Sequence, residues 1–207
     1  MLKENIRSIV CRKYRIKTTD SSHRYRVAEN ILDRDFHAER TGQKWLADLT
    51  YIRTAISWLY LEIVMDLADQ KIIGWALNII LKVWDMSVAA WRMVIKNRPI
   101  IASLLFHSDQ GFQFACPEFS NELKLWPVTQ SMSQKGSYWD NAAAESFFKT
   151  LKTELIYQTD YATIKEAERA IFEYIKVDYN RNRIHSILDY HTPEEFETKL
   201  NQVKNAA

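Results

Sequence analysis

The sequence predicts an α/β domain in which helices cover the faces of a five-stranded mixed sheet. Three segments rich in β-forming residues, 44–52, 58–66 and 71–80, follow one another with short polar breaks. This spacing is typical of an antiparallel meander. After residue 85, helical and strand patterns alternate, which adds strands beside the meander and helices on its faces. Hydrophobic residues make up 47% and charged residues 26% of the 207 residues, as in globular proteins.

The remaining elements follow from local signals. Pro99 ends a helix that Asp85 opens, and Asp140 is a suitable N-cap for a later one. Thr192-Pro193-Glu194-Glu195 opens the last, short helix, with Pro at the first helical position and acids in the first turn. In chain order, the sequence predicts a helix over 1–13, an extended lead-in over 14–42, a helix from 85, a strand over 102–106, a helix over 117–125, a strand over 127–132, a mobile loop over 133–139, helices over 140–157 and 163–179, and a short helix from 193.

Composition excludes several classes of protein. The longest apolar stretch, residues 72–81, is interrupted by Gly74 and Asn78, so we expect no membrane span. Cys11 and Cys116 form no CxxC motif, which excludes a disulfide framework and suits a reducing cytosol. The net charge is only +2, but the basic residues gather near the two ends of the chain. That distribution suggests a polyanionic partner, although a solvated surface would look the same.

Asp48 is the first candidate site residue. It lies in the middle of a predicted strand with apolar neighbours on both faces, where an unpaired carboxylate would cost several kcal/mol. It must therefore be paired, hydrogen-bonded or bound to a metal ion. A structural role, with the hydroxyl of Thr50 as its partner, is the alternative. Asp66 is a rival for a strand-borne ligand, and we interpret it as structural.

Asp109 and Glu145 are the second and third candidates. Asp109 directly follows a predicted strand, at the end of a sheet where ligands bind in α/β proteins, although Asp-Gln-Gly is also a plain turn. Glu145 shares one edge of its helix with Lys149 and Lys152, which a solvated Glu–Lys pair would also explain. Together, three carboxylates at one sheet edge suit two Mg²⁺ or Mn²⁺ ions that promote a phosphodiester displacement.

Five ordered segments then carry a resemblance to a known family. The chain resembles the catalytic part of bacterial insertion-sequence transposases, which have a core of the retroviral-integrase type. The spacing also resembles the family's, with 35 residues between Asp109 and Glu145. The segments that carry the resemblance are Gln43–Tyr51, Phe106–Gly111, Ser131–Gly136, Asp140–Phe148, and Tyr179-Asn180-Arg181 with Arg183 and His185-Ser186.

The resemblance implies an RNase H-like fold and an acidic triad of Asp48, Asp109 and Glu145. It implies metal-dependent cleavage and transfer of DNA strands, with transposon ends and target DNA as partners and a homo-oligomer assembled on DNA. It implies a cytoplasmic protein that associates with the nucleoid when bound to DNA. We expect DNA contacts at Lys135, Lys149, Lys152, Asn141, Arg181 and Arg183, and we interpret His107 as a strand-end histidine that could also contact DNA or support the site. The predicted division is a basic lead-in (1–40), an integrase-type catalytic core (41–160) and a C-terminal helical extension (161–207).

The chain also departs from the family pattern. Asp69-Gln70 stands where Ser-Arg is usual, and Trp126-Pro127 replaces a Gly-containing turn. Full-length relatives carry an upstream helix-turn-helix region, whereas only Met1 to about Thr19 stands in the corresponding place here, ahead of the part that leads into the catalytic core. Two alternative functions remain open: an RNase H-like nuclease that does not join strands, and an inactive DNA-binding remnant of a mobile element.

Overall fold

The strand β1 (Lys44–Arg53) lies at the centre of the molecule. The computed structural model describes residues 23–100, 103–134 and 138–206, and within them the sheet has the strand order β3-β2-β1-β4-β5. β2 (Trp58–Asp66) and β3 (Ile72–Asn78) continue antiparallel on one side of β1. β4 (Leu104–Ser108) and β5 (Val128–Met132) run parallel to it on the other side. The predicted mixed sheet is therefore confirmed.

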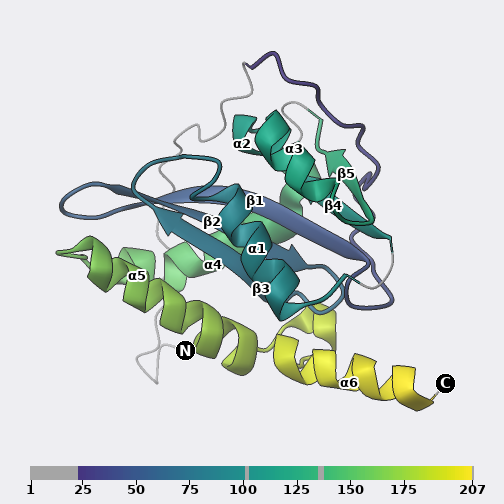
Figure 1. Ribbon diagram of the computed structural model, residues 1–207. Helices are drawn as coiled ribbons and strands as arrows, with labels where there is room; N and C mark the ends of the chain where they lie inside the picture. Colours follow the sequence, from purple (N-terminus) through teal and green to yellow (C-terminus); the bar gives the residue numbers. More distant parts are fainter. Residues whose placement is uncertain (1–22, 101–102, 135–137, 207) are drawn as a thin grey trace, which may run out of the picture.

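Both faces of β1 are covered by helices, as its apolar pattern predicts. Trp45, Ala47 and Leu49 belong to a core shared with α1 (Ser87–Asn97) and α3 (Pro117–Leu123). Leu46 and Ile52 point the other way, into a core shared with α4 (Ala142–Glu154) and α5 (Ile164–Glu173). Figure 1 shows α1 in front of the sheet and α4 behind it. The alternation places Asp48 on the α4 face of β1.

Several helix boundaries differ from those that the sequence predicts. The helix expected from Asp85 begins at Ser87, and Cys116 follows an additional short helix, α2 (Phe112–Ala115). The last helix, α6 (Pro193–Ala206), is longer than expected. A one-turn 3₁₀ helix, η1 (Tyr138–Asn141), precedes α4, and another, η2 (Ile156–Gln158), follows it.

The largest difference lies after α5. The chain continues as a π-helix, η3 (Tyr174–Asn182), before a 3₁₀ turn, η4 (Ser186–Leu188), leads to α6. The buried amide of Asn180 accepts a hydrogen bond from Ile72 N (3.0 Å) and donates one to Ile72 O (3.0 Å). The first residue of β3 is thus paired with η3. The predicted helix over 1–13 lies outside the described residues, as does the middle of the loop over 133–139.

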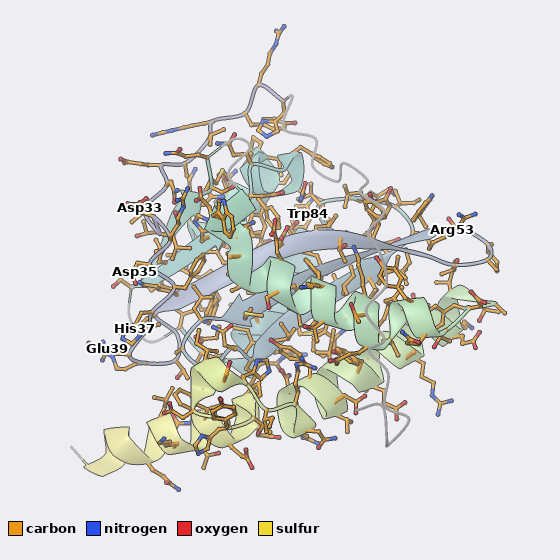
Figure 2. The ribbon with its side chains drawn as sticks, turned by 180° about the vertical axis from the view of Figure 1, so that it is seen from behind. Asp33, Asp35, His37, Glu39, Arg53 and Trp84 are labelled. Atoms are coloured by element: carbon orange, nitrogen blue, oxygen red, sulfur yellow. The ribbon has the colours of Figure 1, made fainter. Side chains whose placement is uncertain are left out.

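The lead-in runs along one edge of the molecule. Figure 2 shows Asp33, Asp35, His37 and Glu39 at this edge, and Arg53, the last residue of β1, at the opposite one. Residues 24–42 contain no helix or strand, in agreement with an extended lead-in. Among the described residues, no helix is long and apolar enough to cross a membrane. The division into three segments at residues 40 and 160 remains a prediction.

Candidate active site

The register between β1 and β4 brings the first two candidate acids together. Ala47 pairs with Ser108 in this parallel ladder, so the next residues in register are Asp48 and Asp109. Neighbouring strands lie about 4.8 Å apart, and residues in register point to the same face. Burial raises the pKa of Asp48, and repulsion by the nearby carboxylate of Asp109 raises it as well.

Local hydrogen bonds orient both carboxylates. The backbone N–H of Leu49 donates to Oδ1 of Asp48 (2.8 Å), and the N–H of Gly111 donates to Oδ1 of Asp109 (2.8 Å). The second bond closes a tight turn after β4, so Asp109 forms a turn and also faces Asp48. The alternative partner of Asp48, the hydroxyl of Thr50, bonds Lys152 instead.

Glu145 completes the acidic cluster from α4. Its carboxylate is close enough to Asp48 to raise the pKa of that residue, although less than burial and Asp109 do. Glu145 lies in the first turn of α4, where the helix dipole favours an acid, and its side chain is exposed. The buried residues of α4 are Ala144, Phe147, Phe148 and Leu151, which pack the helix on the sheet and leave Glu145 at the edge of the packed face.

Lys152 lies at the same place. Its Nζ donates a hydrogen bond to Oγ1 of Thr50 (2.6 Å) and lies 5.7 Å from the ring centre of Tyr51. Burial lowers the pKa of Lys152, and the attraction of Asp48 opposes this effect. Lys152 is thus a half-buried cation, held next to Asp48 by its bond to Thr50, and it partly offsets the negative charge of the cluster.

A fourth acid, Glu62, lies on the opposite face of the sheet. It is buried on β2, and Ser87 Oγ of α1 donates to its Oε2 (2.7 Å). Burial, opposed by the hydrogen bond from Ser87 and reinforced by the charges of Asp109 and Asp48, raises the pKa of Glu62 to about 8. Sequence reasoning missed this residue, although its apolar neighbours on β2 are the same signal that identified Asp48.

The donor set fits a divalent metal ion. Two half-buried carboxylates, one on β1 and one directly after β4, repel each other, and a hard cation between them would remove that repulsion. In the described part of the chain, however, no three His, Cys, Asp or Glu side chains are already arranged to hold one metal ion. Asp48 and Asp109 are thus the pair around which an ion would bind, and Glu145 stands beside them.

The other predicted site residues have different surroundings. Lys149 is exposed on α4, whereas Asn141 is buried against the end of β4. Arg181 forms an ion pair with Glu194 (2.9 Å), and Arg183 forms one with Glu154. Lys135 lies outside the described residues. DNA contacts by these residues remain predictions, and contacts by the two arginines would have to replace intramolecular ion pairs.

Asp66, the rival carboxylate, is fully engaged elsewhere. Its Oδ2 accepts hydrogen bonds from Arg98 Nη1 (2.6 Å), Trp45 Nε1 (2.9 Å) and Gly42 N (2.7 Å). These bonds confirm its interpretation as a structural residue.

Comparisons with known proteins point to one family. Two family models, each described as an integrase core domain, match residues 38–138 and 145–200. The chain is 37% identical over 178 residues to the transposase InsF for insertion sequence IS3A of Escherichia coli (strain K12), covering 86% of this chain and 62% of that protein. It is 38% identical over 168 residues to the transposase for insertion sequence element IS904 of Lactococcus lactis, covering 81% of this chain and 66% of that protein.

Solved structures establish the fold. The magnesium complex of the HTLV-2 integrase catalytic core domain (trimeric form) has a TM-score of 0.59 at 13% identity, covering 76% of this chain and 97% of that one. A chain of the simian T-cell lymphotropic virus intasome, in complex with the PP2A regulatory subunit B56 gamma, has a TM-score of 0.63 at 10% identity, covering 86% of this chain and 60% of that one. The sheet is thus the RNase H-like sheet of retroviral integrase cores. The chain, which spans about 62% of the length of the E. coli relative, belongs to the family of bacterial insertion-sequence transposases with an integrase core domain.

Proposed function

We propose that this chain is the catalytic part of a DNA transposase, a polynucleotidyl transferase that cleaves the ends of a mobile element and joins them to other DNA. The observation that carries the proposal is the register of β1 and β4: Asp48 and Asp109 directly follow the paired residues Ala47 and Ser108, and the charge of Asp109 acts on Asp48. The charge of Glu145, on α4, raises the pKa of Asp48, which supports the acidic triad that the family resemblance implies.

Each residue has a distinct role in this proposal. Asp48 and Asp109 would hold one Mg²⁺ or Mn²⁺ ion, and Glu145 would complete the site of a second. Bound ions would supply Lewis-acid stabilisation of the charge that develops on the phosphodiester oxygens. Lys152, held beside Asp48 by Thr50, would bind a DNA phosphate, and Lys149 would bind another from the exposed side of α4. Water, and then a 3′-hydroxyl of the DNA, would be the nucleophile.

The similar proteins support the nature of the metal and the partners. The HTLV-2 core was solved with magnesium, in trimeric and dimeric forms. We extend this to a divalent ion, and to a homo-oligomer assembled on transposon ends and target DNA. The protein would work in the bacterial cytoplasm, on the nucleoid when it is bound to DNA.

A joining assay tests the proposal. Wild-type protein, incubated with labelled DNA ends, a plasmid target and Mg²⁺ or Mn²⁺, should nick the donor strand and form joined products. Glu145→Gln should abolish both products while DNA affinity is retained, because the substitution keeps the shape and removes a ligand charge. Glu173→Gln, at an exposed glutamate of the neighbouring helix α5, is the matched control and should remain active.

The two alternative functions predict other results. Metal-dependent nicking without joined product would indicate a nuclease that does not transfer strands. DNA binding without nicking in any divalent metal would indicate an inactive remnant. A Glu145→Gln protein that still joins ends would remove the triad from the mechanism.

A further inference from the structure

A buried chain of polar groups connects the end of β4 to the start of α4. His107, on β4, lies two residues before Asp109, and its ring is fully buried. Its Nδ1 lies 2.8 Å from Oγ of Ser131 on β5. Its Nε2 is also buried, as is Oδ1 of Asn141, the residue that precedes α4. Within the described residues, neither of these two atoms has a hydrogen-bond partner of good geometry.

The contacts of Ser131 determine which nitrogen of His107 carries the proton. The backbone N–H groups of Ile31 and Leu32 both donate to Oγ of Ser131, at 2.9 and 3.2 Å. A hydroxyl has two acceptor lone pairs and one hydrogen, so these two donors occupy both lone pairs. The hydroxyl hydrogen must therefore be donated to Nδ1 of His107. A neutral imidazole that accepts at Nδ1 carries its proton on Nε2.

Asn141 is the acceptor that this proton needs. The side chain of Asn141 lies close enough to the His107 ring to act on its pKa as a hydrogen-bonding group, so the two side chains are neighbours. A buried N–H and a buried carbonyl are both costly to leave unpaired, and a hydrogen bond between the two side chains satisfies both. We propose that His107 is a positioning residue whose Nε2–H donates to Oδ1 of Asn141 and thereby holds the start of α4 against the end of β4.

This link matters because of what lies on either side of it. Asp109 follows His107 by two residues, and Glu145 follows Asn141 by four. The next residue before Asn141 is anchored as well, because Asp140 accepts hydrogen bonds from Arg34 Nε (2.9 Å), Asn30 Nδ2 (3.1 Å) and Gln134 N (3.0 Å). The hydrogen-bonded chain thus sets the position of Glu145 relative to Asp109, and this catalytic part of the inference rests on the proposed function.

The protonation state can be tested without DNA or metal. Long-range ¹⁵N–¹H correlation spectra of the whole chain should show a neutral His107 ring with the hydrogen on Nε2. The chain has five histidines, and the His107 signals are assigned by their loss in His107→Gln. Ser131→Ala, which removes the donor to Nδ1, should release the ring into a mixture of tautomers. A wild-type His107 with its hydrogen on Nδ1 would overturn the inference, whatever the protein does to DNA.

A double-mutant cycle tests the positioning role. His107→Phe and Asn141→Ala should each lower the joining rate, by as much as 100-fold if Glu145 shifts by about 1 Å. Both variants should bind Mn²⁺ at Asp48 and Asp109 as the wild type does. Because both remove the same link, the double variant should be no slower than the slower single variant.

Two controls make the result specific. His107→Gln, which can place an N–H near the position of Nε2, should recover part of the rate. His37→Phe changes an exposed histidine of the lead-in and should join DNA at the wild-type rate. Rate losses that multiply in the double variant would show that His107 and Asn141 act independently and would overturn the link. The cycle is measured only if the wild type joins DNA. A wild type that does not join DNA would contradict the proposed function and would leave the tautomer test of the link unchanged.

Discussion

Glu62 shows how a single buried side chain responds to the charge of the candidate site. Its pKa in the folded protein is about 8, mainly because of burial, whereas an exposed glutamate has a pKa near its ordinary value of 4.5. The folded state therefore binds more protons than the unfolded state between these two pH values. The stabilisation that comes from neutral Glu62 is complete below pH 4.5 and is lost as pH rises through 8.

Glu62→Gln should remove this pH dependence. The amide oxygen can still accept the hydrogen bond from Ser87, but no charge has to be buried. Without metal ions, the free energy of unfolding should fall between pH 5 and pH 8 in the wild type more than in the variant. The difference between the two losses should be on the order of 3 kcal/mol. Urea unfolding at both pH values measures it, with exposed Glu173→Gln as the control. Parallel pH profiles of wild type and Glu62→Gln would contradict the assignment.

At the level of residues, position in a predicted strand or helix was sufficient to identify the candidate acids. Asp48, Asp109 and Glu145 were each ambiguous alone, and their convergence depends on the register of β1 with β4. The bond between Lys152 and Thr50 could not be predicted, because it joins residues 102 positions apart. The burial of Asn141 could not be predicted either, because it depends on packing against β4, which is distant in the sequence.

Gly74 shows a constraint between two elements. A Cβ built on this residue of β3 would lie 2.8 Å from Ala90 O of α1 and would overlap Cγ2 of Val94. The helix can therefore approach the strand closely only because no side chain is present. Gly74→Ala should destabilise the fold by about 1–3 kcal/mol, as overpacking does.

Thermal or urea unfolding of four proteins tests this close approach. Val94→Ala removes the overlapping methyl groups, so the Gly74→Ala, Val94→Ala double variant should lose less stability than the sum of the single variants. The contact with Ala90 O remains, so the rescue should be incomplete. Strictly additive losses would show that α1 is not held against β3 at this point.

The strands and most helices could be predicted because their signals are local. All five strands match segments with apolar and β-forming residues, within about two residues at most ends. Asp140 was predicted to cap α4, but the cap position is Asn141, and the carboxylate of Asp140 instead binds Asn30 and Arg34. In the π-helix η3, Asn180 is hydrogen-bonded to Ile72, 108 positions away. Partners more than 100 residues away leave no local pattern.

At the scale of the whole molecule, a buried guanidinium joins segments that are far apart in the sequence. Arg98, directly after α1, forms ion pairs with Asp66 at the end of β2 (2.6 Å), Asp69 in the following turn (2.8 Å) and Glu197 of α6 (2.5 Å). Asp66 and Asp69 are fully buried. The network therefore attaches α6 to the sheet and compensates two charges that could not be buried alone.

Arg98→Leu should destabilise the protein strongly. It leaves the two buried carboxylates without their cation, and breaking buried pairs in this way costs about 3–5 kcal/mol. Arg92→Leu is the matched control, because Arg92 is exposed where it pairs with Glu122, and this pair should be worth less than about 1 kcal/mol. Calorimetric melting of both variants measures the difference. Equal melting temperatures would contradict a supporting role for the Arg98 network.

The central claim is that Asp48 and Asp109 form a divalent-ion site at the end of β4. Titration of the whole chain with Mn²⁺, followed by calorimetry, tests it most directly. Wild type should bind Mn²⁺, and Asp48→Asn and Asp109→Asn should each lose at least about tenfold in affinity, since a charged ligand becomes neutral. Asp85→Asn, an exposed carboxylate beside α1, should bind as the wild type does. Equal Mn²⁺ affinity in all four proteins, or no binding by the wild type, would contradict the account.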